Sequence, residues 1–123
     1  MDDRTSRLLE ALDPVGVELL VELLAETATE ATLVAAVRES SQATVNRRLQ
    51  RLRSARLVFQ EAGARRAPGR FWSVVHPAET EALLGALFDL LDTIDARDRG
   101  RRAQARRRVK RARAARLGIR RVD

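Results

Sequence analysis

Residues 32–58 constrain the fold more than any other stretch, because they predict two helices joined by a short polar turn. Leu33 and Val37 lie four residues apart, which puts them on one face of a first helix. One face of a second helix carries the apolar residues Val45, Leu49 and Leu52. These apolar faces predict a common core under both helices.

The opposite face of the second helix is polar and basic. Because successive residues turn by about 100°, the side chains half a turn from Val45 point away from the core. They are Ala43, Arg47, Gln50 and Ser54, flanked by Thr44, Asn46 and Arg51. Five arginines and no carboxylate occur between Gln42 and Arg56, whereas an ordinary solvated helix mixes both signs. This face therefore suits a polyanion.

The residue types on this face match the chemistry of a DNA duplex. Arginine, glutamine and asparagine carry donors and acceptors that fit guanine and adenine edges in the major groove, while serine, threonine and further arginines bind phosphates. The turn, Arg38–Gln42, contains two serines whose hydroxyls can accept from the free N–H groups that open a helix. Together these features are typical of a helix-turn-helix.

A further helix precedes the pair. Asp13 and Pro14 predict its start, because aspartate caps helices and proline fits the first turn. It continues to about Glu26 through the apolar residues Val17, Leu20, Val21 and Leu24. Thr27–Thr29 is the predicted connection to Glu30–Val37, the first helix of the pair.

A β-hairpin is predicted after the basic helix. Leu57–Glu61 and Arg70–Val75 are rich in β-formers and flank a loop with glycine and proline, so they form antiparallel neighbours. Phe71 and Trp72 point to opposite faces of a strand, so at most one belongs to the core. Arginines at or near the tip are suited to the DNA backbone or a narrow minor groove: Arg65, Arg66 and Arg70. The alternative is a surface loop that is basic for solubility.

His76 and Pro77 open a last amphipathic helix, whose broad apolar stripe is too wide for one small domain to cover. Half of it packs on the domain, and the rest predicts a partner helix from a second identical chain. The predicted homodimer interface comprises Leu8, Leu9, Leu12, Leu83, Leu87, Leu90, Leu91 and Ile94. The alternative is that the three N-terminal leucines cover the stripe within one chain.

Charge divides the chain into segments. Residues 1–37 carry a net charge of −6 and residues 38–70 a net +7, while residues 71–96 carry −5 and residues 97–123 carry +11. A basic middle between acidic flanks is typical of a protein that turns one face to nucleic acid. A hairpin beside a helix-turn-helix is called a wing. From the predicted elements and the change of charge we divide the chain into a winged helix-turn-helix and dimerisation domain, 1–96, and an Arg-rich tail, 97–123.

The tail repels itself, so we expect it to be loose until a polyanion neutralises it. Its simplest role is a sequence-independent clamp on DNA, although RNA or an acidic protein would satisfy it equally well.

Several classes of function find no support. There is no cysteine, so disulfides and thiolate chemistry are excluded, and His76 is the only histidine. A single histidine before proline is typical of a structural position, so we expect no enzyme activity, no metal and no cofactor. No apolar run approaches the roughly 20 residues of a membrane span, and the acidic start lacks the features of a signal peptide. We expect a cytoplasmic, nucleoid-associated protein that makes no membrane contact.

In order and residues, the segment 8–96 resembles the winged helix-turn-helix of ArsR-like bacterial regulators, a pattern that MarR-like regulators share. Ser41–Leu49 is similar to an SQSTVSRHL-type recognition helix, Leu52–Val58 to an LREAGLV exit, and Arg65–Val75 to a basic wing with an aromatic return strand. The resemblance implies base or phosphate contacts from Ser41, Gln42, Thr44, Asn46 and Arg47, a backbone contact from Arg65 or Arg66, and a homodimer of the first and last helices.

Three departures from the family pattern stand out. The turn is one residue longer, Arg56 replaces a frequent glycine, and the metal-sensing cysteines are absent. A left-handed exit at Arg56 would cost roughly 1 kcal/mol, or the helix ends differently.

The sequence thus predicts a mainly α fold with a small β-hairpin, a winged helix-turn-helix with an additional C-terminal dimerisation helix. The predicted function is a homodimeric, sequence-specific transcriptional regulator that binds double-stranded DNA. The predicted DNA contacts are Ser41, Gln42, Thr44, Asn46, Arg47, Arg48, Gln50, Arg51, Arg65, Arg66 and Arg70. The alternatives are an architectural or RNA-associated protein, and a protein-interaction module on the same fold.

Overall fold

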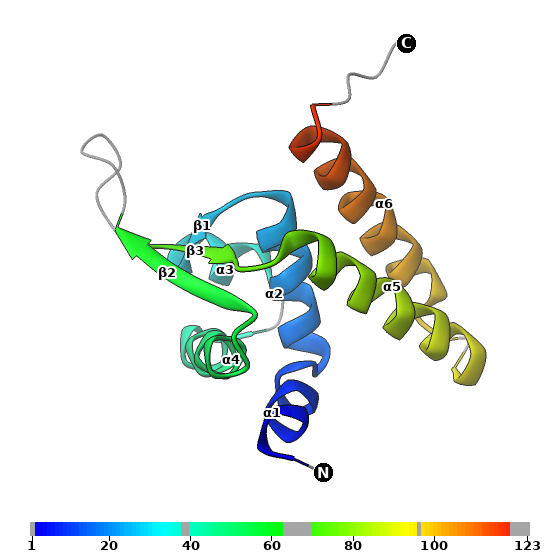
Figure 1. The fold of residues 1–123 in the computed structure, drawn as a ribbon, viewed down its shortest axis with the longest axis horizontal. Helices are drawn as coiled ribbons and strands as arrows, with labels where there is room; N and C mark the ends of the chain where they lie inside the picture. The colour runs from blue at the N-terminus through cyan, green and yellow to red at the C-terminus, as the bar shows by residue number, and fades with distance from the viewer. Residues whose placement is uncertain (1, 38–39, 63–69, 96, 119–123) are drawn as a thin grey trace.

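A computed structural model of the chain describes residues 2–37, 40–62, 70–95 and 97–118. Within them, there are six helices and a small antiparallel sheet, which lies at one side of the molecule next to α2, α3 and α4 (Figure 1). In chain order the elements are α1 (Asp3–Ala11), α2 (Pro14–Ala25), β1 (Ala28–Thr29), α3 (Glu30–Ala36), α4 (Gln42–Ser54), β2 (Val58–Ala62), β3 (Arg70–Val74), α5 (Pro77–Ile94) and α6 (Arg99–Arg116).

The start of α2 is built as its sequence predicts. Asp13 Oδ1 accepts a hydrogen bond from the backbone N–H of Gly16 at 2.8 Å, and Pro14 occupies the first turn. The turn between α1 and α2 is so tight that a Cβ on Gly16 would lie 2.0 Å from the carbonyl oxygen of Ala11. Glycine is therefore needed for this close approach.

The predicted hairpin is confirmed by the antiparallel pairing of β2 with β3, in which Val58 is opposite Val74 and Ala62 is opposite Arg70. The connection 63–69, with Arg65 and Arg66, lies outside the described residues. Part of the predicted connection Thr27–Thr29 is instead a third strand, β1, which pairs with the other edge of β3 to give the order β1-β3-β2.

The core forms around α2, which packs against α3, α4, α5, α6 and β3. The predicted inner face of α4 is confirmed, because Val45, Leu49 and Leu52 are fully buried. Trp72 is buried as well, whereas Phe71 is half-buried, so one of the two aromatic residues belongs to the core as expected.

The expectation of a loose tail is wrong for residues 99–116, which form α6. This helix packs against α2 and α5 and buries Val109 and Ala112 in the common core. The change of composition at residue 97 therefore does not coincide with the end of the core.

Candidate nucleic-acid interface

The start of α4 is fixed by a serine cap. Ser41 is extended, and its Oγ accepts a hydrogen bond from the backbone N–H of Thr44 at 3.1 Å. The two hydroxyls are also hydrogen-bonded, with Ser41 Oγ donating to Thr44 Oγ1 at 3.1 Å. The helix therefore begins at Gln42, which settles the register of the longer turn.

Most of the predicted DNA contacts on α4 are accessible to solvent. Ser41, Gln42, Asn46, Arg47, Gln50 and Arg51 are exposed, and Thr44 is half-buried. Within the described parts of the chain, neither Arg47 nor Arg51 forms an ion pair. Their donors are thus available for phosphate oxygens or base edges.

Asn46 is already engaged by an acidic residue. Its Nδ2 donates to Oε1 of Glu30, the first residue of α3, at 2.7 Å. An asparagine has two N–H donors and a carbonyl oxygen, so this bond leaves one donor and the acceptor for a partner. Glu30 also brings a negative charge to the edge of the basic surface. Neither the pattern of α4 nor that of α3 indicated this contact.

Arg48 points toward the body of the protein. Its Nε forms a hydrogen-bonded ion pair with Oδ2 of Asp13, and both side chains are mostly covered. Asp13 uses its other oxygen to cap α2, so one carboxylate joins α4 to the α1–α2 junction. In this conformation Arg48 positions α4, and its contact with nucleic acid stays a prediction.

Arg70 is exposed at the first position of β3, next to the tip of the hairpin. In Figure 1 the hairpin extends away from the helices on the same side of the molecule as α4. The hairpin and α4 therefore belong to one half of the molecule, and the contact of Arg70 with nucleic acid stays a prediction.

Helix α4 is followed by a residue in the left-handed conformation. Arg56 has a φ of 61°, and the N–H of Leu57 bonds back to the carbonyl of Leu52 at 3.0 Å. This is the exit in which glycine is favoured, because a side chain in the left-handed region is strained. The structure thus keeps the geometry of the exit even though arginine occupies the position.

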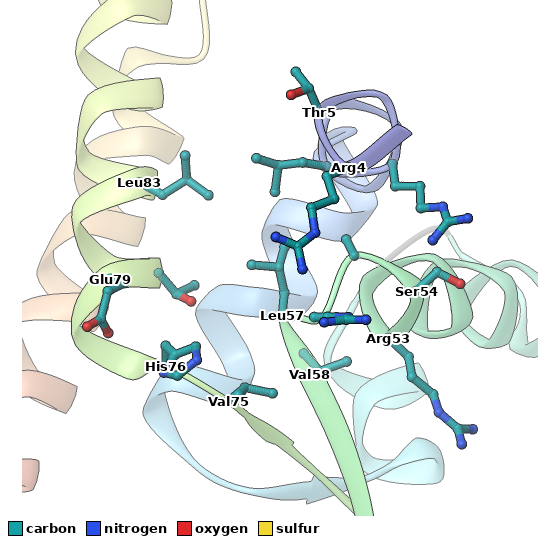
Figure 2. Close-up of a pocket in the computed structure, with 15 residues that line it drawn as sticks. Arg4, Thr5, Arg53, Ser54, Leu57, Val58, Val75, His76, Glu79 and Leu83 are labelled. Atoms are coloured by element: carbon teal, nitrogen blue, oxygen red, sulfur yellow. The ribbon is translucent and has the colours of Figure 1, made fainter. Parts of the chain in front are cut away.

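A groove of about 680 Å³ separates α1 from the start of α5, and the C-terminal end of α4 forms part of its floor. Figure 2 shows His76, Glu79 and Leu83 on the α5 side and Arg4 and Thr5 on the α1 side. Its apolar lining comes mainly from Leu8, Leu57, Val58, Val75 and Leu83. Sequence periodicity gave no sign of this groove, because its walls come from segments far apart in the chain.

The residues predicted to form a dimer interface remain accessible in the single chain. On α5, Leu84 and Phe88 are buried against the core, whereas Leu90 and Ile94 are 57% and 69% exposed. On α1, Leu9 is 57% exposed. The remaining five, Leu8, Leu12, Leu83, Leu87 and Leu91, are half-buried.

In the described parts of the chain, no group of three or more histidine, cysteine or acidic side chains is arranged to hold a metal ion. None of the helices described is long and apolar enough to cross a membrane.

Comparison with known proteins identifies the architecture. No protein-family profile matches the chain, and no curated protein matches it. A solved structure from Enterococcus faecalis V583, described as a transcriptional regulator assigned to the MarR family, superimposes with a TM-score of 0.59, and the match covers 82% of this chain and 93% of that one. The fold is a winged helix.

In this winged helix α3 and α4 are the helix-turn-helix, and β2 and β3 are the wing. The sequence identity to the Enterococcus protein is 22%, so the likeness concerns the fold. The mainly helical architecture with a small antiparallel sheet is therefore confirmed, and the ArsR-like subfamily stays a prediction.

Proposed function

We propose that this winged-helix protein is a homodimeric transcriptional regulator that recognises a specific DNA sequence. The observation that carries the proposal is the exposed basic side of α4, where Arg47 and Arg51 have no carboxylate partner among the described residues. The fold shared with a protein described as a transcriptional regulator agrees with this role.

The proposed contacts follow from side-chain chemistry and position. Arg47 and Gln50 lie on the outermost line of α4 and would read base edges in the major groove, with Asn46 at its flank. Ser41, Gln42 and Thr44 surround the N-terminal end of α4, where free N–H groups favour a phosphate. Arg51 and the wing residues Arg65, Arg66 and Arg70 would add backbone contacts, and Arg48 would add one only after leaving Asp13.

A homodimer is proposed because one flank of α5 is apolar and uncovered. Leu90, Ile94 and Leu9 expose more than half of their surface, and the groove keeps α1 from covering α5. A second copy would bury these side chains and set two recognition helices at a fixed spacing, as a palindromic operator requires. Such a role would place the protein on the nucleoid in the cytoplasm.

Selection of bound fragments from random DNA, at low and at moderate salt, tests the proposal. A sequence-specific regulator enriches one motif at both salt concentrations, whereas an architectural protein enriches none and loses binding as salt rises. Arg47→Ala should relax the motif at one position. The matched control is Arg53→Ala on the groove side of the same helix, which should leave the motif unchanged. Failure to bind any duplex at low salt would favour a protein-interaction module.

A further inference from the structure

The inner side of α6 is neutralised by carboxylates from the rest of the fold. Arg106 lies 2.7 Å from Asp92 and 2.8 Å from Asp89 of α5, and it stacks over Phe88. Other arginines of this side pair with Asp92, Glu22 and Glu81: Arg102, Arg108, Arg113 and Arg116. These ion pairs, together with buried Val109 and Ala112, hold α6 in place.

The outer side of α6 carries cations without such partners. Arg107, Lys110 and Arg111 are exposed, and in the described parts of the chain none of them pairs with a carboxylate. At about 100° per residue Arg107 and Arg111 lie opposite the buried Val109, and Lys110 lies beside them on the flank toward α5. We name these three residues the outer cations. Because their helix is already folded and packed, a ligand need not order it.

The helix that carries the outer cations lies on the far side of α2 from α4. Helix α2 packs against both α4 and α6, and Figure 1 shows α4 and α6 on opposite sides of α2. A straight duplex in contact with α4 and the wing would therefore not reach the outer side of α6. The sequence-based expectation of a clamp on the same duplex does not fit this arrangement.

We propose that the outer cations bind a second DNA duplex, so that one molecule joins two DNA segments. This inference rests on the proposed binding of the first duplex by α4. A duplex carries about one negative charge per 1.7 Å of its axis, which makes it a rigid, dense partner for a rigid basic helix. One helical turn before and after the cations, the same side of α6 carries Ala103, Gln104 and Ala114, which supply no large apolar group for insertion into a lipid surface.

The same surface is poorly suited to the centre of a homodimer. In a two-fold symmetric contact each patch faces its own copy, so the outer cations would oppose like charges. The apolar flank of α5 has no such conflict. The proposed dimer thus leaves the outer cations accessible.

A sandwich capture experiment tests the inference. An immobilised duplex that carries a preferred site is loaded with the full-length protein, and capture of a fluorescent duplex of unrelated sequence is then measured. Arg107→Gln/Arg111→Gln is compared with Arg4→Gln/Arg7→Gln, which removes the same charge from exposed positions of α1. We expect the α6 variant to capture about tenfold less of the second duplex, while its affinity for the first stays within about twofold. The α1 variant should match the unaltered protein.

Several outcomes would overturn the inference. One is that the α6 variant loses as much affinity for the first duplex as capture of the second. Helix α6 would then contact the same DNA as α4. Another is loading of the first duplex without any capture of a second by the unaltered protein, which leaves the function proposed for α4 intact. A third is displacement of the second duplex by polyglutamate as readily as by unlabelled duplex at equal charge, which would indicate an acidic protein partner.

Arg47→Ala separates the two proposals. It should weaken loading on the preferred site and leave capture through α6 unchanged when the protein is immobilised directly.

Discussion

Asn46 donates a hydrogen bond to Glu30 over 2.7 Å, so the first residue of α3 holds a side chain of the proposed DNA-reading surface. This contact orients the asparagine and places a carboxylate at the edge of the surface that is proposed to bind a polyanion. Binding of DNA at this edge therefore includes a repulsive contribution from Glu30.

Glu30→Gln should increase the affinity for DNA several-fold at low salt, because the charge is lost while an amide oxygen can still accept from Asn46. Titration of a labelled duplex at two salt concentrations measures the effect, which should shrink as salt rises. Glu10→Gln, an exposed change of the same charge on α1, is the control. An equal gain in both variants would mean that net charge alone matters.

Gly16→Ala and Gly85→Ala should change stability in opposite directions. At Gly16 the new Cβ would meet the carbonyl oxygen of Ala11 at 2.0 Å, so we expect a loss of about 3 kcal/mol or more. At Gly85, inside α5, nothing lies within 4 Å of the new Cβ, so we expect a gain of up to about 1 kcal/mol. Chemical denaturation measures both. A mild effect at residue 16 would contradict the tight turn between α1 and α2.

Arg56→Gly should stabilise the fold by about 1 kcal/mol, because glycine adopts a φ of 61° without strain. Arg53→Gly, three residues earlier and inside α4, should instead cost about 1 kcal/mol. Thermal unfolding of the two variants beside the unaltered protein gives the comparison. A loss of stability in both variants would show that the left-handed φ of Arg56 does not lower the stability of the fold.

Acidic pH should weaken the packing of α6 against α5, because protonation of Asp92 removes its ion pairs with Arg102 and Arg106. Hydrogen bonds from Arg102 and Arg106 hold the pKa of Asp92 below its ordinary value of 3.8. A carboxyl with a lowered pKa stabilises the fold above the ordinary value, and this contribution is lost as the pH falls through the lower, folded value. Asp92→Asn should therefore show a shallower decline in unfolding free energy between about pH 5 and pH 2. Parallel pH curves for the two proteins would contradict this coupling.

The exposed flank of α5 should carry the dimer. Leu90→Asp/Ile94→Asp introduces charges at positions that are 57% and 69% exposed, so the single chain should remain folded while self-association is lost. Sedimentation velocity measures the molecular mass in solution. Phe59→Asp, at a 41% exposed position of β2, should leave association unchanged. A monomeric unaltered protein, or a dimer that survives both charges, would contradict the proposed interface.

Features fixed by neighbouring residues could be predicted from the sequence. The caps at Asp13 and Ser41 act over three residues, and the apolar spacing of Val45, Leu49 and Leu52 defines the buried face of α4 by itself. The pairing of β2 with β3 followed from the short connection between them.

Features that depend on distant partners could not be predicted. Strand β1 has two residues and exists because Ala28 and Thr29 pair with Trp72 and Phe71 of β3. The charge of α6 suggested self-repulsion, yet its arginines find carboxylates elsewhere, such as Arg108 with Glu22, which is 86 residues away. In the candidate site, the bond from Asn46 to Glu30 and the groove beside α4 could not be predicted either, because separate segments of the chain form them.

Asp13 belongs to no surface proposed to touch DNA. One of its carboxylate oxygens caps α2, and the other pairs with Arg48, 35 residues further along the chain. A genetic screen for lost operator binding should therefore recover alleles at Asp13 along with those in α4. Such mutants would lose DNA binding although Asp13 is not a point of contact, because the substitution changes the orientation of α4 and leaves its exposed side chains unaltered.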